Sequence, residues 1–168
     1  MEDTPSCFNM NLGQIGKVCG VAAPGEVSGI VATGVSTDTR TLAPGDLFVA
    51  LRGETHDGHD YVQVALDAGA CAVVVSDAAR VPTGRPALVV EDTLIAFGRI
   101  AAAHRAELDV QIAAVTGSVA KTTTKNIVAA ILAEVGETLS APGTQNNEVG
   151  VPRTLLSLCP SHRFAVLE

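Results

Sequence analysis

Aromatic residues are scarce in this chain: Trp is absent, Tyr occurs once, and aromatics make up 3% of the 168 residues. The 47% of residues that are hydrophobic are therefore mainly Val, Ala, Leu and Ile. Small and branched aliphatic side chains suit a parallel sheet that is buried under helices on its faces. The composition favours a packed α/β core that needs no disulfide or metal staple.

Positive charge and metal-binding cysteine spacings are also lacking. The net charge of −7 argues against a broad nucleic-acid-binding surface. The four cysteines contain no Cys-x-x-Cys pair, which argues against a metal knuckle or redox motif. The chain has neither a long uninterrupted apolar run nor a basic and then apolar N-terminus. We therefore expect no membrane span, no signal peptide and a cytoplasmic location.

Strand and helix patterns alternate along most of the chain, which predicts an α/β fold. Apolar runs predict strands at 47–51, 70–75, 87–90, 110–115 and 164–167. Helical spacing predicts a helix capped by Asp92 or Thr93, and another over 121–135 whose inner face carries Ile127, Val128, Ile131 and Leu132. We expect a leader over 1–10, a small α/β domain over 11–107, and over 108–168 the first part of a P-loop-type parallel-sheet domain that is cut off.

A phosphate-binding loop is predicted between the strand at 110–115 and the helix at 121–135. Backbone N–H groups of such a loop, and the N-terminal end of the helix, favour phosphate oxygens. The general pattern places Gly directly before the Lys and five positions earlier, where this chain has Ala120 and Val115. The alternative is an ordinary strand–helix turn with a chance Lys-Thr pair. The expected ATP-binding residues are Gly117, Ser118, Val119, Ala120, Lys121, Thr122 and Thr123.

Several motifs in a fixed order resemble those of the Mur ligases, which build the cell-wall peptide on a UDP-sugar. Three segments resemble the N-terminal domain of that family: Ser-Thr-Asp-Thr-Arg at 36–40, Pro-Gly-Asp-Leu-Phe-Val-Ala-Leu-Arg-Gly at 44–53, and Asp-Gly-His-Asp at 57–60. A fourth segment, Thr-Gln-Asn-Asn-Glu-Val-Gly-Val-Pro at 144–152, resembles the central domain of the members that add D-alanyl-D-alanine. The resemblance runs from about residue 11 to the end of the chain.

The resemblance implies a UDP-substrate site in the first domain, formed by Ser36, Thr37, Asp38, Thr39 and Arg40. Hydroxyl groups and a guanidinium can hydrogen-bond a diphosphate and uracil, which agrees with this assignment. The alternative is that Asp38 and Arg40 form a local pair that stabilises a turn.

The resemblance implies an ATP and Mg²⁺ site in the second domain, with Lys121 as the catalytic residue. Thr122 and Glu168 are the expected Mg²⁺ ligands, since ligands gather at the carboxyl ends of strands in open α/β sheets. Asn146 and Asn147 are expected to line the cleft; the alternative is an Asx-turn before a helix that starts near Val149.

The activity implied by the resemblance is ATP-dependent ligation in peptidoglycan precursor synthesis, and hence in cell shape and division. UDP-N-acetylmuramoyl tripeptide would be phosphorylated to an acyl phosphate, which D-alanyl-D-alanine attacks. The alternatives are a ligase that adds the third residue to the UDP-sugar dipeptide, or a non-catalytic nucleotide-sugar-binding paralogue. We expect a monomer, without nucleic-acid or membrane partners, and no turnover from this chain alone.

Histidines supply no further site in the sequence pattern. His56 and His59 bracket Asp57 and Gly58, and we expect both to lie in a solvated polar loop rather than at a metal. No Ser–His–Asp arrangement can be argued from the sequence.

Overall fold

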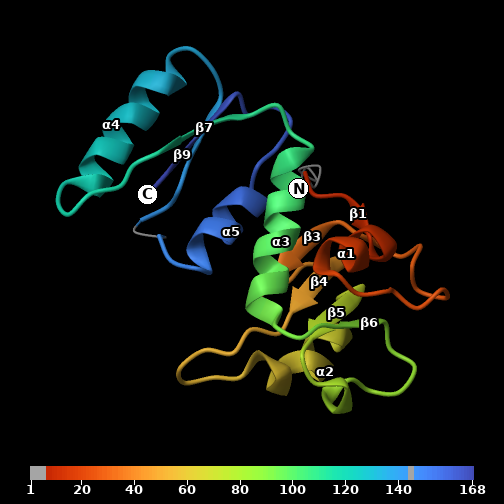
Figure 1. Cartoon of the computed structure of the whole chain (residues 1–168). Coiled ribbons are helices and arrows are strands. Elements are labelled where there is room, and N and C mark those ends of the chain that lie inside the picture. Colours follow the sequence, from red (N-terminus) through yellow and green to blue (C-terminus); the bar gives the residue numbers. More distant parts are fainter. Residues whose placement is uncertain (1–6, 144–145) are drawn as a thin grey trace. The chain divides into compact units, whose positions relative to one another are not determined.

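The structure is a computed structural model, and it describes residues 7–143 and 146–168. The chain divides into two units, Met1–Ile100 and Ala101–Glu168, each with its own parallel sheet (Figure 1). The predicted α/β class with parallel strands is confirmed. The division falls inside helix α3 (Thr93–Ala106), whereas the sequence pattern places the domain boundary after residue 107; the domain bounds remain a prediction.

The main sheet of the first unit has four parallel strands. They follow the order β3 (Gly34–Ser36), β4 (Asp46–Val49), β5 (Ala72–Val75) and β6 (Ala87–Val89). Phe48 of β4 lies opposite Val73 of β5, and all four residues of β5 are buried. Side chains alternate between the two faces of a strand, so this sheet is covered on both faces. That burial explains why a core poor in aromatics is sufficient.

Local capping signals define helix α1 and the two 3₁₀ helices of the first unit. Helix α1 (Leu12–Cys19) begins with a capping box between Asn11 and Gln14 and ends at Gly20, whose φ is 80°. The short strands β1 (Met10–Asn11) and β2 (Val31–Ala32) pair antiparallel. The 3₁₀ helix η1 (Gly58–Tyr61) leads into α2 (Val62–Asp67), and a second 3₁₀ helix, η2, spans Ala78–Arg80.

The predicted leader is described only in part. Residues 1–6 lie outside the described residues. Phe8 and Met10, which the sequence pattern assigns to the leader, are buried, and Met10 opens strand β1.

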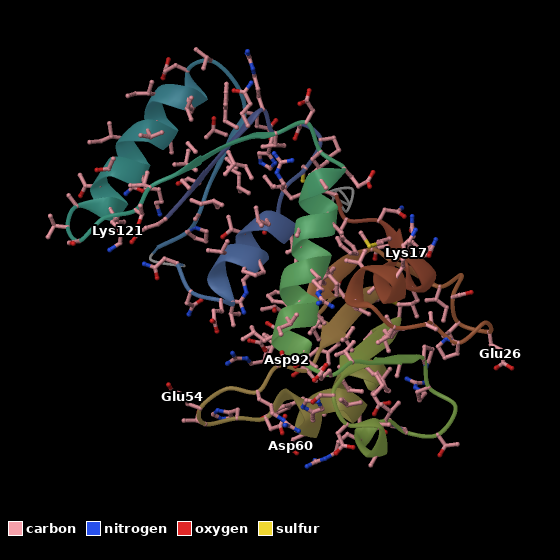
Figure 2. The ribbon with its side chains drawn as sticks, viewed as in Figure 1. Lys17, Glu26, Glu54, Asp60, Asp92 and Lys121 are labelled. Carbon is pink, nitrogen blue, oxygen red and sulfur yellow. The ribbon has the colours of Figure 1, made fainter. Side chains whose placement is uncertain are left out.

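The loop between β4 and η1 is closed at its base by backbone hydrogen bonds. Gly58 N donates to Leu51 O at 2.8 Å, and Gly53 N donates to His56 O at 2.9 Å. A Cβ atom at Gly58 would lie 2.7 Å from Leu51 O, so no side chain fits there. Glu54 lies at the outer end of this loop (Figure 2).

The second unit contains a three-stranded parallel sheet in the order β7 (Gln111–Ala114), β9 (Phe164–Leu167) and β8 (Thr138–Ser140). Helices α4 (Lys121–Ala133) and α5 (Gly150–Leu156) lie on opposite sides of these strands (Figure 1). Ala165 of β9 lies in register between Ile112 and Leu139, and this row packs with Leu155 and Leu158. One face of the sheet therefore packs against α5, while α4 covers the other.

The inner face of α4 differs from the sequence prediction. Ile127 and Ile131, which were expected to face the core, are 56% and 64% exposed, whereas Lys125 is 1% exposed. The half-buried residues Val128 and Leu132 share a helix face with Lys125, because residues three and seven positions on return to the same side. The helix is thus rotated so that a lysine, rather than an isoleucine pair, faces β8 and β9. No helix in the described part of the chain is long and apolar enough to span a bilayer.

Candidate functional site

The predicted phosphate loop lies where the sequence places it, between β7 and α4. Val115 N donates to Leu167 O at 2.9 Å, which ties the start of the loop to the end of β9. The first helical bond of α4 runs from Thr124 N to Ala120 O at 2.9 Å. The N-terminal end of α4, with Lys121 in its first turn (Figure 2), therefore opens at the carboxyl edge of the sheet. Anions bind favourably at such a position.

Ala120 adopts a backbone conformation that suits glycine. Its φ of 60° and ψ of 13° lie in the left-handed region, and it is the only non-glycine residue with positive φ in the described part of the chain. The left-handed conformation costs an L-residue about 1–2 kcal/mol. The loop therefore keeps the backbone shape that Gly would supply, at the expense of strain at Ala120.

Three of the predicted site residues meet beside this loop. The Thr122 hydroxyl donates to Glu168 Oε2 at 2.6 Å, and Asn146 Nδ2 donates to Glu168 Oε1 at 3.1 Å. Thr122 belongs to the first turn of α4, Glu168 follows β9, and Asn146 precedes α5. A carboxylate, a hydroxyl and an amide from three separate segments thus converge at the carboxyl edge of the sheet.

The donor set fits a magnesium ion that also binds phosphate. Mg²⁺ prefers oxygen ligands and commonly takes only one or two protein carboxylates, with water and substrate phosphates completing the shell. The Thr122 oxygen can ligate the ion through a lone pair while its O–H still donates to Glu168. In residues 7–143 and 146–168, no cluster of three or more His, Cys, Asp or Glu could hold a metal by itself.

Asn147 caps the following helix. Its Oδ1 accepts hydrogen bonds from Gly150 N at 2.7 Å and Val149 N at 3.2 Å. This is the Asx-turn geometry that the sequence left open as the alternative for this pair. The two neighbouring asparagines therefore differ, since Asn146 contacts Glu168 and Asn147 organises the start of α5. Thr144 and Gln145, which the resemblance also covers, lie outside the described residues.

The predicted UDP loop follows β3 at the carboxyl edge of the first sheet. The Ser36 hydroxyl donates to Asp38 O at 2.9 Å, which closes a tight turn. Arg40 Nε and Nη2 both donate to the Asp38 carboxylate, with the shorter contact at 2.6 Å. The local Asp38–Arg40 pair that the sequence left open is therefore formed in this structure. Whether the loop also binds a nucleotide remains a prediction.

His59 is buried rather than solvated, which corrects the expectation for the loop at 56–59. Its Nδ1 lies 2.6 Å from Asp57 Oδ1, and its Nε2 accepts from Ser76 N at 2.9 Å and lies 3.1 Å from Ser76 Oγ. The backbone N–H of His59 is the main cause that holds the pKa of Asp57 below its usual range. His56, in contrast, is exposed as expected.

The Asp57–His59–Ser76 chain of contacts is not apparent from the sequence. It depends on the parallel pairing of β4 with β5, which brings the segments after these two strands to one edge of the sheet. Because the Ser76 backbone N–H already donates to Nε2, the imidazole anchors the loop rather than standing ready to activate the Ser76 hydroxyl.

Comparison with known proteins agrees with this geometry. Residues 31–135 match the Mur ligase family, catalytic domain, and residues 115–168 match the Mur ligase middle domain. The chain is 49% identical over 143 residues to a UDP-N-acetylmuramoyl-tripeptide–D-alanyl-D-alanine ligase of Synechocystis, an alignment that covers 80% of this chain and 30% of that protein.

Two solved structures show the same fold. MurF from Acinetobacter baumannii superposes with a TM-score of 0.85 at 30% identity, over 97% of this chain and 36% of that one. MurF ligase from Thermotoga maritima in complex with ADP superposes with a TM-score of 0.73 at 29% identity, over 80% of this chain and 31% of that one.

The class that the fold defines is an α/β protein with parallel sheets, whose second sheet carries a strand–loop–helix unit of the P-loop type at its carboxyl edge. More specifically, the chain belongs to the Mur ligase family, whose catalytic-domain match covers more than half of it. The chain spans about a third of the length of the relatives that it matches.

Proposed function

We propose that this chain supplies the nucleotide-binding elements of an ATP-dependent amide ligase of peptidoglycan precursor synthesis. The proposed substrates are UDP-N-acetylmuramoyl tripeptide and D-alanyl-D-alanine, with ATP and Mg²⁺. The observation that carries the proposal is the convergence of Thr122, Glu168 and Asn146 beside the phosphate loop. The name of the Synechocystis relative and the ADP complex of the Thermotoga maritima MurF ligase support it.

The proposed chemistry has two steps. The terminal carboxylate of the UDP-linked peptide attacks the γ-phosphorus of ATP, which forms an acyl phosphate and releases ADP. The amine of D-alanyl-D-alanine then attacks the acyl carbon, phosphate leaves, and the nitrogen loses a proton. Positioning and charge neutralisation account for most catalysis in phosphoryl transfer.

Each residue of the site has a role in this scheme. The Lys121 ammonium neutralises charge on the β- and γ-phosphates, and the loop from Gly117 to Thr123 supplies backbone N–H donors. Thr122 would hold Mg²⁺ directly, with Glu168 beside it and Asn146 orienting the Glu168 carboxylate. Mg²⁺ supplies positive charge to the phosphate oxygens when it is bound.

The loop at 36–40 is proposed to bind the UDP part of the substrate. Its position at the carboxyl edge of a parallel sheet supports this role, because ligands gather there in α/β folds. Arg40 donates two guanidinium N–H groups to the Asp38 carboxylate, and its side chain is otherwise exposed to solvent. The remaining guanidinium N–H groups of Arg40 would be available to a diphosphate.

The test is ATP binding by this chain with and without Mg²⁺, measured by calorimetry. We expect Mg²⁺ to tighten binding, and Thr122→Val to remove most of that gain, roughly tenfold for the loss of one charge-assisted contact. Thr124→Val is the matched control, because Thr124 is exposed two positions further along α4. Identical affinities with and without Mg²⁺ in the unmodified chain would refute the proposed site.

A non-catalytic nucleotide-sugar-binding protein is the second candidate, and the left-handed Ala120 favours it. For a chain that spans the full length of the relatives, the two candidates differ in phosphate release. A ligase releases phosphate only when both UDP-N-acetylmuramoyl tripeptide and D-alanyl-D-alanine are present, whereas the second candidate binds ATP without turnover. Release with the UDP-sugar dipeptide and a single amino acid would instead indicate the ligase that adds the third residue.

A further inference from the structure

Lys125 is the one buried residue of α4, and its side chain carries a charge. It is 1% exposed in a helix whose other residues are half-buried or exposed. An ammonium group loses much of its hydration on burial, and a neutral side chain of similar volume usually fills such a place at no cost in stability. Its burial therefore points to a role besides filling space.

The partners of Lys125 lie in one short segment. Its Nζ donates to Ala141 O at 2.5 Å and to Gly143 O at 2.8 Å. Gly143 has a φ of 56°, so the backbone turns where the ammonium holds it. These carbonyls follow β8, and the chain then leads to Asn146. The lysine thus fixes the segment after β8 to the helix that starts at the phosphate loop.

The same helix also reaches Asn146 by a second route. Thr122 precedes Lys125 by three positions, so the two residues are neighbours on the helix surface. Thr122 contacts Glu168, and Glu168 contacts Asn146. Two sets of contacts therefore attach the segment around Asn146 to α4. One runs through Glu168 to Thr122, and the other runs through Lys125 to the carbonyls of Ala141 and Gly143.

We propose that Lys125 is a positioning residue: it holds the segment after β8 so that Asn146 lies beside Glu168 and Thr122. This role rests on the nucleotide site proposed above. Without the ammonium, the two carbonyls lose their donor and the segment is free to move away from α4. Asn146 then loses its hydrogen bond to Glu168. Mg²⁺ binding should weaken as a result, while the phosphate loop keeps its conformation.

The experiment compares Lys125→Met, Asn146→Ala and the double variant in this chain. The readouts are ATP affinity with and without Mg²⁺, and the ¹⁵N signal of the Asn146 side-chain amide. We expect Lys125→Met to lower the Mg²⁺-dependent affinity roughly tenfold, to shift the Asn146 amide signal, and to leave Mg²⁺-independent binding unchanged. Lys125→Met and Asn146→Ala disrupt the same contact between Asn146 and Glu168. Their losses of Mg²⁺-dependent ATP affinity should therefore not add in the double variant. Lys125→Arg, which keeps the charge and donors, should recover part of the loss.

Controls separate this role from simple loss of charge or of folding. Lys17→Met removes an exposed lysine of α1 and should leave every readout unchanged. If Lys125→Met does not fold, Lys125→Gln carries the same test, because its shorter neutral amide cannot reach both carbonyls. An unshifted Asn146 signal, or additive losses in the double variant, would overturn the proposal. Failure of the unmodified chain to bind ATP would overturn the proposed function instead, and the nucleotide-free Asn146 signal would still test Lys125.

Discussion

Replacing Ala120 by glycine should improve the phosphate loop. Ala120 has a φ of 60°, a conformation that costs an alanine about 1–2 kcal/mol and a glycine little. Glycine also loses more backbone entropy on folding, which offsets about 0.4–1 kcal/mol of the gain. We therefore expect Ala120→Gly to raise the free energy of unfolding by up to about 1.5 kcal/mol.

The effect on ATP affinity depends on whether Ala120 keeps its left-handed conformation when no nucleotide is bound. If the loop relaxes when empty, ATP must restore the left-handed conformation, and the full strain of about 1–2 kcal/mol lowers the affinity by roughly 5- to 30-fold. If the loop keeps this conformation when empty, the strain is equal in both states and cancels. The strain that Ala120→Gly relieves should therefore appear either as Mg²⁺–ATP binding at least about fivefold tighter, in the first case, or as higher stability, in the second.

The assay is calorimetric titration of Mg²⁺–ATP, combined with urea unfolding of the same two proteins. Val119→Gly is the matched control, because Val119 is 85% exposed and has no positive φ to relieve. It loosens the loop without removing strain, and it should not tighten binding. Equal ATP affinity and equal stability for Ala120→Gly and the unmodified chain would refute the reasoning and show that the loop tolerates Ala120.

Three further predictions concern the first unit and α3. Millimolar UDP-N-acetylmuramoyl tripeptide should shift the backbone amide signals of residues 36–40, and unshifted signals there would exclude the proposed UDP site. Asp92→Ala should lower the free energy of unfolding by about 1 kcal/mol, because Asp92 Oδ1 accepts from Leu94 N and Ile95 N; an unchanged urea midpoint would contradict this. The pKa of Asp57 is lowered mainly by the His59 backbone N–H, so its stabilisation is present above the ordinary Asp pKa of about 3.9 and is lost as pH falls through the lower, folded value. Asp57→Asn should therefore weaken the loss of stability as pH falls below the ordinary Asp pKa, and an identical acid unfolding curve would argue against that contribution.

Local sequence signals were sufficient to predict the architecture, including the strand–loop–helix unit formed by β7 and α4. Apolar runs bounded by turn residues marked the strands β4, β5, β6, β7 and β9 within a few residues. Asp92 was one of two expected caps for α3, and it makes the capping bonds. These features depend on neighbours within a few positions, so hydrophobic period and capping chemistry determine them.

The orientation of α4 could not be predicted in this way. Its apolar residues permit two overlapping inner faces, one with Ile127 and Ile131 and one centred on Lys125, and both include Val128 and Leu132. Hydrophobicity favours the first face. The structure takes the second, because two backbone carbonyls of the segment after β8 accept bonds from Lys125, and their positions depend on tertiary folding.

Contacts between distant segments were missed for the same reason. His59 and Ser76 are 17 positions apart and meet only because β4 and β5 are parallel neighbours. The resemblance placed Thr122, Glu168 and Asn146 in one site, but the hydrogen bonds among them, which join segments from three places in the sequence, were not predicted. The residue types at these positions indicated a site, but the pairing of strands determines which atoms touch.

The loop between β4 and η1 offers a place to attach a reporter. Its base admits no side chain at Gly58 and is held by Leu51, so substitutions there would disrupt the strand end. Its outer end, at Glu54, is exposed and projects away from the sheet (Figure 2). A cysteine at Glu54, carrying a fluorescent dye, would sit on a loop whose two stems are anchored at the carboxyl edge of the first sheet. Dye emission would then test for binding at the proposed UDP site in real time, without altering residues 36–40.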